Sequence, residues 1–374
     1  MGESMKVAFE LQPCCGNRSG IGNYTYELAK RMQDGDGLEF HGNVFNFLGR
    51  NDNASSLAGI SMPLREFKLL PYGAYRRIWN TVHIPYDHLF RGKSDLSVFF
   101  NYIVPPGVDG KVMTTVYDMT YLRFPETMNA KNLKRLQDGM KYSVERADRI
   151  ITISEFSKQE IIELLGVPSE NISVLPCAPS LTGHAADFEQ CKEKFGITKP
   201  YLLYVGTIEP RKNLSRLIQA FAQLKRECGI QHQLVLAGGK GWANEEIYKA
   251  AESVEDVVFT GYISENEKYA LYKNAAAFLF PSLYEGFGIP PLEAMFFGCP
   301  VVCAKAASLP EVVGDAAELV EPDDVLSIAE GIWRILSNED HAKELVERGY
   351  DRIKKYTWDR SAQMLTEICK TVLR

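Results

Sequence analysis

The stretch LYEGFGIPPLEAMFFGCPVV, residues 283–302, joins a glycine-rich loop to a short helical pattern and then to an apolar run. AFLFPS (277–282) precedes it and PVVCA (300–304) ends it, and both are short apolar runs of the kind that form buried strands. Two parallel strands need a crossover connection, most often a helix. The stretch therefore predicts a strand–loop–helix–strand unit in a parallel sheet.

The same alternation continues along most of the chain. Amphipathic segments such as 212–228 and 241–252 lie between the apolar runs and predict helices. This pattern predicts an α/β protein with two doubly wound Rossmann-like domains that face each other across a cleft, with the ligand at the carboxyl ends of the strands. The other predicted strands are KVAFEL (6–11), DLSVFF (95–100), KVMTTVYD (111–118), RIITIS (149–154), ISVLP (172–176), YLLYVGT (201–207), QLVLAG (233–238) and VVFTGY (257–262).

The pattern is interrupted near PCAPSLTGHAADFEQ, residues 176–190, which is rich in small residues and has no clean period. Such a segment is typical of a linker. We therefore expect an N-terminal domain at residues 1–178 and a C-terminal domain at residues 191–355, which 374 residues can accommodate.

Composition excludes several classes. The net charge of −6 gives no general attraction to nucleic acid. The eight cysteines lack metal-ligand spacing and suit a reducing compartment. The N-terminal MGESMKVAFEL has no signal-peptide pattern, and no run of about 18 apolar residues occurs. We expect a cytoplasmic protein with no metal site and no cofactor.

Two glutamates flank the glycine loop of the opening stretch. Gly286 and Gly288 free the backbone to approach a ligand, and the prolines after them fit the first turn of a helix. We expect Glu293 in that first turn, where the helix dipole alone would favour a carboxylate. Glu285 has no such explanation. Carboxylates only accept hydrogen bonds, so this pair suits a ligand rich in hydroxyls.

A second candidate site is YVGTIEPRKNLSRLIQAF, residues 204–221. A predicted strand ends at Gly206, and Arg211 and Lys212 follow it before a helix. Two cations at the carboxyl end of a strand can bind phosphate oxygens. An ordinary solvated turn explains the same residues equally well.

Together these two stretches resemble family 4 of the retaining glycosyltransferases, which have the two-domain GT-B fold. The Glu–x7–Glu pattern, followed by a helix of small residues and an apolar strand, carries the resemblance, which is strongest from 200 to 325. It implies transfer of a hexose from a nucleoside-diphosphate sugar to a hydroxyl of a glycan or lipid-linked glycan. It also implies that the last helix, within residues 356–374, returns to the N-terminal domain.

The resemblance assigns roles by position. It implies that Lys212 binds the donor diphosphate, that Glu293 binds the ribose and that Glu285 contacts the transferred sugar. Thr207 is a further implied donor contact, at a position where many family members have arginine. Arg211 could compensate or could face away, so the implied diphosphate binding rests mainly on Lys212. The implied backbone contacts with the donor are at Gly20, Gly22, Tyr262, Ile263, Phe287, Gly288 and Ile289.

One departure concerns TTVYDMTYLRFPE, residues 114–126. Where the family has a histidine that touches the donor sugar, this chain has Tyr117, followed by the expected Asp118. The change is consistent with a different or deoxygenated donor sugar. A buried structural tyrosine is an equally good interpretation.

Residues 64–93 mix basic and aromatic side chains. Such a segment could contact an anionic membrane or bind a lipid pyrophosphate, although a solvated face over core aromatics is the favoured alternative. The residues concerned are Arg65, Lys68, Tyr72, Tyr75, Arg76, Arg77, Trp79, Tyr86, Arg91 and Lys93.

The expected mechanism is metal-independent, with attack on the sugar face from which the diphosphate leaves. GDP-mannose is the favoured donor, with UDP-glucose and dTDP- or UDP-rhamnose as alternatives. A dinucleotide oxidoreductase is disfavoured because no GxGxxG follows the first strand. A nucleotide-sugar epimerase is a further alternative, disfavoured because the Glu–Glu spacing matches the transferases better. A non-catalytic sugar-nucleotide-binding protein stays open as a rival.

Overall fold

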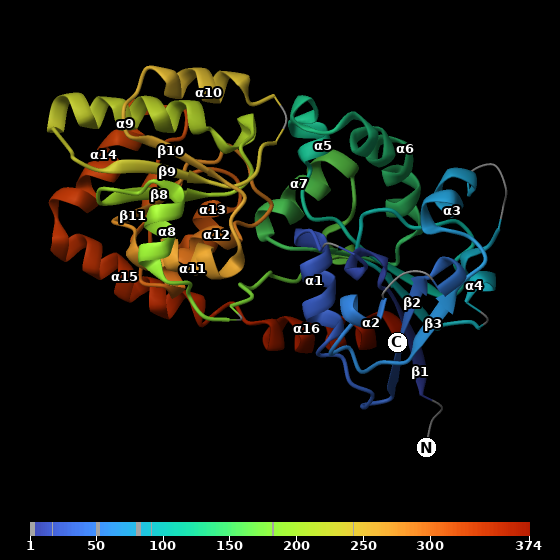
Figure 1. The fold of residues 1–374 in the computed structure, drawn as a ribbon. Coiled ribbons are helices and arrows are strands. Elements are labelled where there is room, and N and C mark those ends of the chain that lie inside the picture. The colour runs from blue at the N-terminus through green and yellow to red at the C-terminus, as the bar shows by residue number, and fades with distance from the viewer. Residues whose placement is uncertain are drawn as a thin grey trace. The chain divides into compact units, whose positions relative to one another are not determined.

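The computed structural model describes residues 4–16, 18–49, 53–79, 84–90, 92–181, 183–241 and 243–374. It divides into two compact units, each with its own parallel sheet (Figure 1). Unit 1 comprises Met1–Tyr121, Ala130–Cys177 and Trp358–Arg374, and unit 2 comprises Leu122–Asn129 and Ala178–Thr357. The predicted α/β class, with two doubly wound sheets, is confirmed.

Unit 1 contains a seven-stranded sheet in the order β3-β2-β1-β4-β5-β6-β7. The chain runs outward from β1 to β3 and then returns to the other side of β1, so the strand order reverses between β1 and β4. Ligands of doubly wound sheets bind outside the carboxyl ends of the strands at such a switch point. The strands are β1 (Met5–Glu10), β2 (Leu38–Phe45), β3 (Leu64–Phe67), β4 (Leu96–Phe99), β5 (Lys111–Thr115), β6 (Arg149–Thr152) and β7 (Ile172–Val174).

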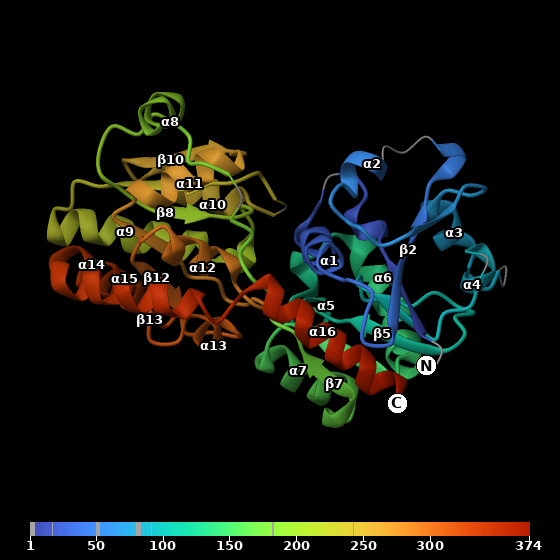
Figure 2. The same cartoon turned by 90° about the horizontal axis from the view of Figure 1, so that it is seen from below.

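The helices of unit 1 include the last helix of the chain. This helix, α16, packs against α1, as both ribbon views show (Figures 1 and 2). Trp358 at its start lies edge-to-face against Tyr24, with ring centroids 5.7 Å apart. The helices are α1 (Gly20–Ala29), α2 (Asn53–Ser56), α3 (Tyr72–Ile78), α4 (Tyr86–Leu89), α5 (Thr120–Arg123, whose last two residues belong to unit 2), α6 (Ala130–Arg146), α7 (Glu155–Leu165) and α16 (Trp358–Leu373).

Unit 2 contains a six-stranded sheet in the order β10-β9-β8-β11-β12-β13. Its switch point lies between β8 and β11, which pair in parallel with Ala277 opposite Leu202 and Phe278 opposite Leu203. The residues of both strands are buried, as expected for a sheet covered on its two faces. The strands are β8 (Tyr201–Val205), β9 (Gln233–Ala237), β10 (Val257–Gly261), β11 (Ala277–Phe280), β12 (Val301–Ala304) and β13 (Glu318–Val320).

Helices cover both faces of the unit 2 sheet (Figure 1). Among them, α9 packs against α10 and α14, and α12 packs against α11 and α15. The helices are α8 (Phe188–Phe195), α9 (Leu214–Cys228), α10 (Glu245–Glu252), α11 (Glu265–Asn274), α12 (Ile289–Phe296), α13 (Leu309–Val313), α14 (Val325–Ser337) and α15 (Glu339–Ile353).

All ten predicted strands are present, but the prediction missed β2, β3 and β13. The strand β2 escaped because polar residues interrupt its apolar run. Its His41 and Asn43 are nevertheless buried, and the His41 ring contacts the Ser94 hydroxyl at 3.2 Å. Burial lowers the pKa of His41 to about 4, so the ring is neutral inside the sheet.

Two further findings concern the whole chain. All eight cysteines are free thiols. Within the part of the chain that the structure describes, no helix combines the length and apolarity that crossing a bilayer requires.

Candidate functional site

The strongest cluster of functional side chains lies at the switch point of unit 2, in the loops that follow β8 and β11. Glycine is required where the β8 loop begins. Gly206 and Gly238 have φ of 156° and 149°, and a Cβ atom on Gly238 would lie 1.9 Å from the Gly206 carbonyl oxygen. The backbones at Gly206 and Gly238 can approach this closely only because neither residue has a side chain, and this contact positions the loop after β8.

A short 3₁₀ helix (Pro210–Lys212) follows, and Asn213 then adopts the left-handed conformation with φ of 61°. The Asn213 side-chain amide donates hydrogen bonds to the carbonyl oxygens of Pro281, at 3.1 Å, and Pro322, at 2.6 Å. These bonds fasten the β8 loop to the loops that follow β11 and β13. Lys212 therefore lies in a turn before α9, and the helix predicted from 212 starts at Leu214.

Glu285 is the centre of the cluster. Lys212 Nζ lies 2.5 Å from Glu285 Oε1, and Arg211 Nη1 lies 3.0 Å from Glu285 Oε2. Arg211 also donates to Glu209 Oε1, at 2.8 Å, and to the Tyr284 carbonyl oxygen. Two cations and two carboxylates thus meet at the carboxyl ends of neighbouring strands, and their formal charges balance.

The protonation of Glu285 follows from these contacts. The side chain is buried, and burial alone would raise its pKa. Lys212 and Arg211 outweigh burial and lower the pKa of Glu285 to about 2. Glu285 is therefore ionised throughout the neutral range and acts only as a hydrogen-bond acceptor.

A serine from a later loop fixes the backbone around Glu285. Ser308 Oγ lies 2.8 Å from the Glu285 carbonyl oxygen and 2.9 Å from that of Phe287, and the two oxygens share its single O–H donor. Gly288 follows with φ of 108°, and a Cβ there would lie 2.6 Å from Leu309 Cδ2. Sequence reasoning missed Ser308, because a lone serine in the loop after the next strand, β12, carries no local signal.

The helix α12 starts at Ile289, with Pro290 and Pro291 in its first turn as predicted. The prediction that Glu293 lies in the first turn is wrong, because Glu293 is the fifth residue of the helix. The helix N-terminus therefore does not explain this carboxylate.

Neighbouring side chains hold Glu293 instead. Glu293 Oε1 accepts from Lys268 Nζ at 2.8 Å, and Oε2 accepts from the Tyr272 hydroxyl at 3.1 Å. Burial raises the pKa of Glu293 above its usual value, against the opposing effect of Lys268. Each oxygen keeps lone-pair capacity for a further donor.

Comparison with known proteins decides the family. Residues 187–352 match the model of the glycosyl transferases group 1, and residues 18–180 match that of glycosyltransferase family 4. The chain is 30% identical to O-antigen chain mannosyltransferase B of Escherichia coli over 377 residues, which cover 95% of this chain and 97% of that protein. The chain is a family 4 glycosyltransferase.

Two other similar proteins extend this result. The glycosyltransferase is 33% identical to serotype-specific mannosyltransferase WbdA of E. coli over 60% of its own length, a stretch that spans 29% of WbdA. It also shares the GT-B fold of the Anabaena protein HepE, solved in complex with UDP and glucose. The TM-score is 0.72 at 18% identity, over 98% of this chain and 100% of that one.

Three other predicted donor contacts of the glycosyltransferase lie in unit 2. Thr207 is exposed, and its carbonyl oxygen accepts from the Tyr204 hydroxyl at 3.1 Å. Tyr262 is 85% exposed and Ile263 is buried, between the end of β10 and the start of α11. Backbone contact with a base at Tyr262 and Ile263 stays a prediction.

Gly20 and Gly22 lie in the first turn of α1 in unit 1. The Ser19 side chain accepts a hydrogen bond from the Gly22 amide at 3.4 Å. A Cβ on Gly22 would lie 2.4 Å from the Pro13 carbonyl oxygen, whereas Gly20 is exposed with open space around it. Close packing thus accounts for glycine at position 22, and only Gly20 leaves its backbone accessible.

Tyr117 is buried, with its ring edge-to-face against Tyr24 and Tyr102. Its hydroxyl donates to the Phe100 carbonyl oxygen at 2.8 Å. These contacts favour the structural interpretation over a sugar contact. The next residue, Asp118, accepts from the Thr120 amide at 3.0 Å at the start of α5.

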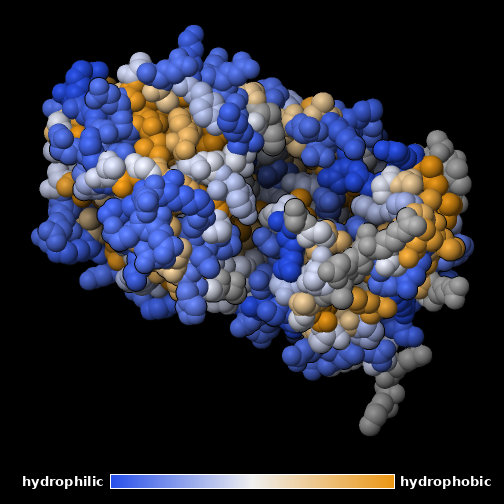
Figure 3. All heavy atoms as spheres, viewed as in Figure 1, coloured by the Kyte–Doolittle hydropathy of each residue, from blue (hydrophilic) through white to orange (hydrophobic). Residues whose placement is uncertain are grey.

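The segment 64–93 divides into core and surface. Tyr75, Trp79 and Tyr86 belong to a buried aromatic cluster, which favours the interpretation of core aromatics. Leu69 is 80% exposed, and apolar side chains gather on the surface over α3 (Figure 3). Arg91 lies outside the described residues.

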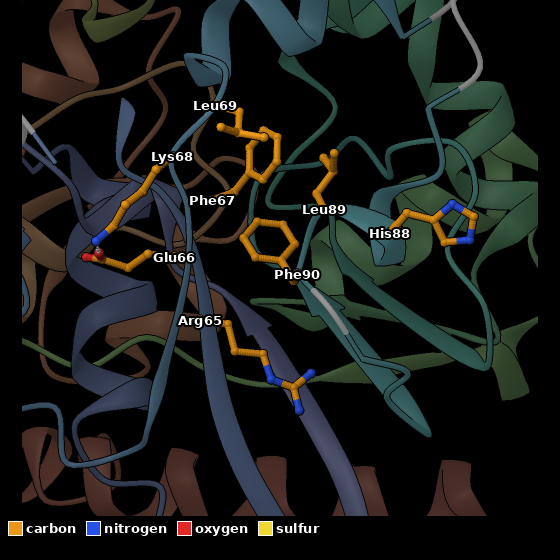
Figure 4. A pocket seen from close by; sticks show the side chains of 8 residues that line it. All are labelled: Arg65, Glu66, Phe67, Lys68, Leu69, His88, Leu89 and Phe90. Atoms are coloured by element: carbon orange, nitrogen blue, oxygen red, sulfur yellow. Dashed lines mark ion pairs between the residues drawn. The ribbon is translucent and has the colours of Figure 1, made fainter. Parts of the chain in front are cut away.

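A pocket of about 570 Å³ is lined by residues of this same segment, from β3, α4 and their flanks. Figure 4 shows Lys68 and Glu66 turned toward each other, in an ion pair of 3.1 Å. Arg65 donates to the Gly92 carbonyl oxygen at 3.4 Å. The positive charge here is therefore largely engaged.

No group of three or more histidine, cysteine, aspartate or glutamate residues with metal-binding geometry occurs among the residues that the structure describes. Metal independence stays a prediction.

Proposed function

We propose that this glycosyltransferase moves a hexose from a nucleoside-diphosphate sugar to a hydroxyl of a glycan or lipid-linked glycan, with retention of anomeric configuration and without a metal. The observation that carries the proposal is the cluster of Arg211, Lys212 and Glu285 at the unit 2 switch point. Ligands of doubly wound sheets bind at this position.

The main barrier to transfer is the negative charge that develops on the departing diphosphate. Lys212 and Arg211 supply two preorganised cations for it. In the absence of donor, Glu285 pairs with both cations at 2.5–3.0 Å, and Glu209 supplies the second negative charge through Arg211. Donor binding would let Lys212 share its donors between Glu285 and a phosphate oxygen, since an ammonium group has three N–H donors.

The two glutamates suit the two sugars of the donor. Glu285 is ionised and can accept hydrogen bonds from hydroxyls of the transferred sugar. Glu293 keeps lone pairs beyond those engaged by Lys268 and Tyr272, and these can accept from ribose hydroxyls. The leaving phosphate takes the proton of the acceptor hydroxyl as the new glycosidic bond forms on the same face.

GDP-mannose is the proposed donor. Two proteins similar to this chain over 60% or more of its length are named as mannosyltransferases. Polysaccharide assembly is the proposed setting, because the name of the relative that matches 95% of the chain refers to an O-antigen chain.

The test is a thermal-shift screen of GDP, UDP and dTDP and of their sugars, followed by a transfer assay. We expect GDP and GDP-mannose to raise the melting temperature most, and nucleotide release on adding acceptor in excess chelator. Preferential stabilisation by UDP or dTDP compounds would overturn the donor assignment. Binding without release of nucleoside diphosphate would indicate a non-catalytic protein, and a strict metal requirement would refute the proposed chemistry.

A further inference from the structure

The switch point of unit 1 also has a distinctive set of side chains. Glu10 is the last residue of β1, and Asn101 follows β4 closely. These two strands are neighbours in the sheet, at the position where its strand order reverses. The rule that places ligands at the carboxyl ends of a doubly wound sheet therefore applies here as well.

A pocket of about 760 Å³ adjoins this position, between α3, α6 and the loop after β4. The side chains from α6 recur every three or four residues, so they lie on one face of that helix. The charged residues that line the pocket are one acid, Asp138, and five bases: Arg76, Arg77, Lys131, Lys134 and Arg135.

The charge of the three arginines has no carboxylate partner in the described part of the chain. Lys134 pairs with Asp138 at 3.0 Å. Among the described residues, none of the three arginines forms an ion pair with a carboxylate. Arg135 donates to Asn101 Oδ1 at 3.0 Å, while its Nε is buried without a partner. Like charges gathered at a partly buried site favour an anionic ligand.

Glu10 does not neutralise the arginines. It is 5% exposed and its Oε1 has no hydrogen-bond partner. It lines a small cavity that shares Trp79 and Ile103 with the basic pocket. Burial raises the pKa of Glu10 to about 8, although the charges of Arg76 and Arg135 oppose the shift. At neutral pH the carboxyl group is mostly uncharged, and an uncharged carboxyl can donate a hydrogen bond.

We propose that this basic pocket binds the diphosphate group of a diphosphate-bearing acceptor. That this ligand is the acceptor rests on the proposed function, whereas the binding of an anion in the pocket does not. Guanidinium groups bind phosphate oxygens through paired N–H donors, and Arg76, Arg77 and Arg135 offer three such groups. Trp79, Ile103 and Val104 give the pocket an apolar wall beside them, suited to the first part of a lipid chain.

The test is calorimetric titration of the full chain with inorganic pyrophosphate and, separately, with farnesyl diphosphate, at fixed salt. A saturating nucleoside diphosphate occupies the donor site. We expect the double variant Arg76→Gln/Arg77→Gln to bind both probes about tenfold or more weakly than the wild type, since each charged hydrogen bond contributes on the order of a factor of ten. The single variant Arg77→Glu, at an exposed position, tests the same point if the double variant folds poorly.

The matched control is Lys141→Gln/Lys343→Gln, which removes two exposed charges outside the pocket. It should keep wild-type affinity. Equal losses in pocket and control variants, or pyrophosphate binding within twofold of wild type in the pocket variants, would overturn the proposal. Tighter binding of farnesyl diphosphate than of pyrophosphate would assign the site to a lipid-linked diphosphate, and equal binding to a soluble one.

This experiment separates the pocket from the donor site. If no nucleotide binds, the proposed function fails, yet pyrophosphate titrated alone still reports on the arginines. If nucleotides bind normally to the pocket variants and pyrophosphate binding is unaffected, the pocket assignment fails by itself.

Discussion

The two switch points of this glycosyltransferase contain similar residues in opposite electrostatic states. At the unit 2 switch point, Glu285 contacts Lys212 and Arg211 directly, and its pKa falls to about 2. At the unit 1 switch point, Glu10 lies near two arginines but pairs with neither, and its pKa rises to about 8. Both carboxyl groups are buried.

The number and closeness of the cations separate the two outcomes. Two cations within hydrogen-bond distance outweigh burial at Glu285, whereas the more distant arginines do not at Glu10, and the single contact with Lys268 does not at Glu293. As a result, the cluster in unit 2 is balanced in charge, and Glu285 can accept hydrogen bonds from hydroxyls. In unit 1 the uncharged Glu10 leaves the positive charge of the arginines unbalanced.

The strongest way to break the unit 2 cluster is Glu285→Gln, which removes the charge shared by Lys212 and Arg211. We expect transfer to fall by about 10²–10³-fold, as for loss of a preorganised polar contact, with part of the nucleotide affinity retained. Steady-state kinetics and calorimetry measure the two effects. The control is Glu209→Gln, because the Glu209 carboxylate pairs with Arg211, whereas the Lys212 ammonium group pairs with Glu285. Comparable turnover in both variants would remove the special role of Glu285.

Stability against pH sharpens the contrast between the two carboxyl groups. The pKa of Glu10 is higher in the folded state than in the unfolded state. Its contribution to the free energy of unfolding, measured against Glu10→Gln, is therefore complete below about pH 4.5 and is lost as the pH rises through about 8. We expect Glu10→Gln to gain on the order of 3 kcal/mol relative to the wild type between pH 5 and 8.

For Glu285, whose folded pKa is lowered, the sign reverses. Its contribution to the free energy of unfolding, measured against Glu285→Gln, is complete above about pH 4.5 and is lost as the pH falls toward 2. Urea midpoints of each variant and the wild type across pH measure both trends. Parallel slopes for the two variants would show that the switch points do not differ as described.

A smaller effect is expected from Lys212→Ala, which removes one of the two cations beside Glu285. Diphosphate affinity should fall about tenfold, the value of one charged contact. Calorimetry with the preferred nucleoside diphosphate measures it. Lys225→Ala is the matched control, since Lys225 pairs with Asp256 away from the cluster. Unchanged affinity in Lys212→Ala would refute the phosphate assignment.

The smallest effect is expected from Ser308→Ala, which leaves the Glu285 and Phe287 carbonyl oxygens without their shared donor. We expect a loss of about 1 kcal/mol of stability and a few-fold fall in turnover. Ser337→Ala removes an exposed hydroxyl that bonds to the Trp333 carbonyl in α14 and should change neither. A wild-type melting temperature for Ser308→Ala would show that the loop does not depend on this serine.

The sequence was informative where chemistry is local. Apolar runs predicted ten of the strands, and the charged turn after β8 predicted Arg211 and Lys212 as neighbours at a strand end. The Glu–x7–Glu spacing singled out Glu285 and Glu293. Each of these signals lies within a few residues of the feature that it predicts.

The remainder depended on contacts between distant residues. The left-handed Asn213 delays α9 past Lys212, and Ser308 fixes a loop about 20 residues earlier in the chain. The Tyr117 hydroxyl is engaged by Phe100, which no motif indicates. The partners of Glu293, Lys268 and Tyr272, lie on another helix. Only the tertiary structure brings such pairs together.

The placement of α16 has a consequence for biosynthesis. Unit 1 includes Trp358–Arg374, and this last helix contacts it through the Trp358 ring, through a 2.8 Å hydrogen bond from Ser361 to the Pro176 carbonyl, and through ion pairs such as Lys370 with Asp36 at 2.9 Å. Strands β1 to β7 are made before α16 and must therefore wait for residues 358–374 before their unit is complete. Until those residues emerge, the face that receives α16 is uncovered, so a chain truncated before residue 358 exposes apolar surface to chaperones and proteases.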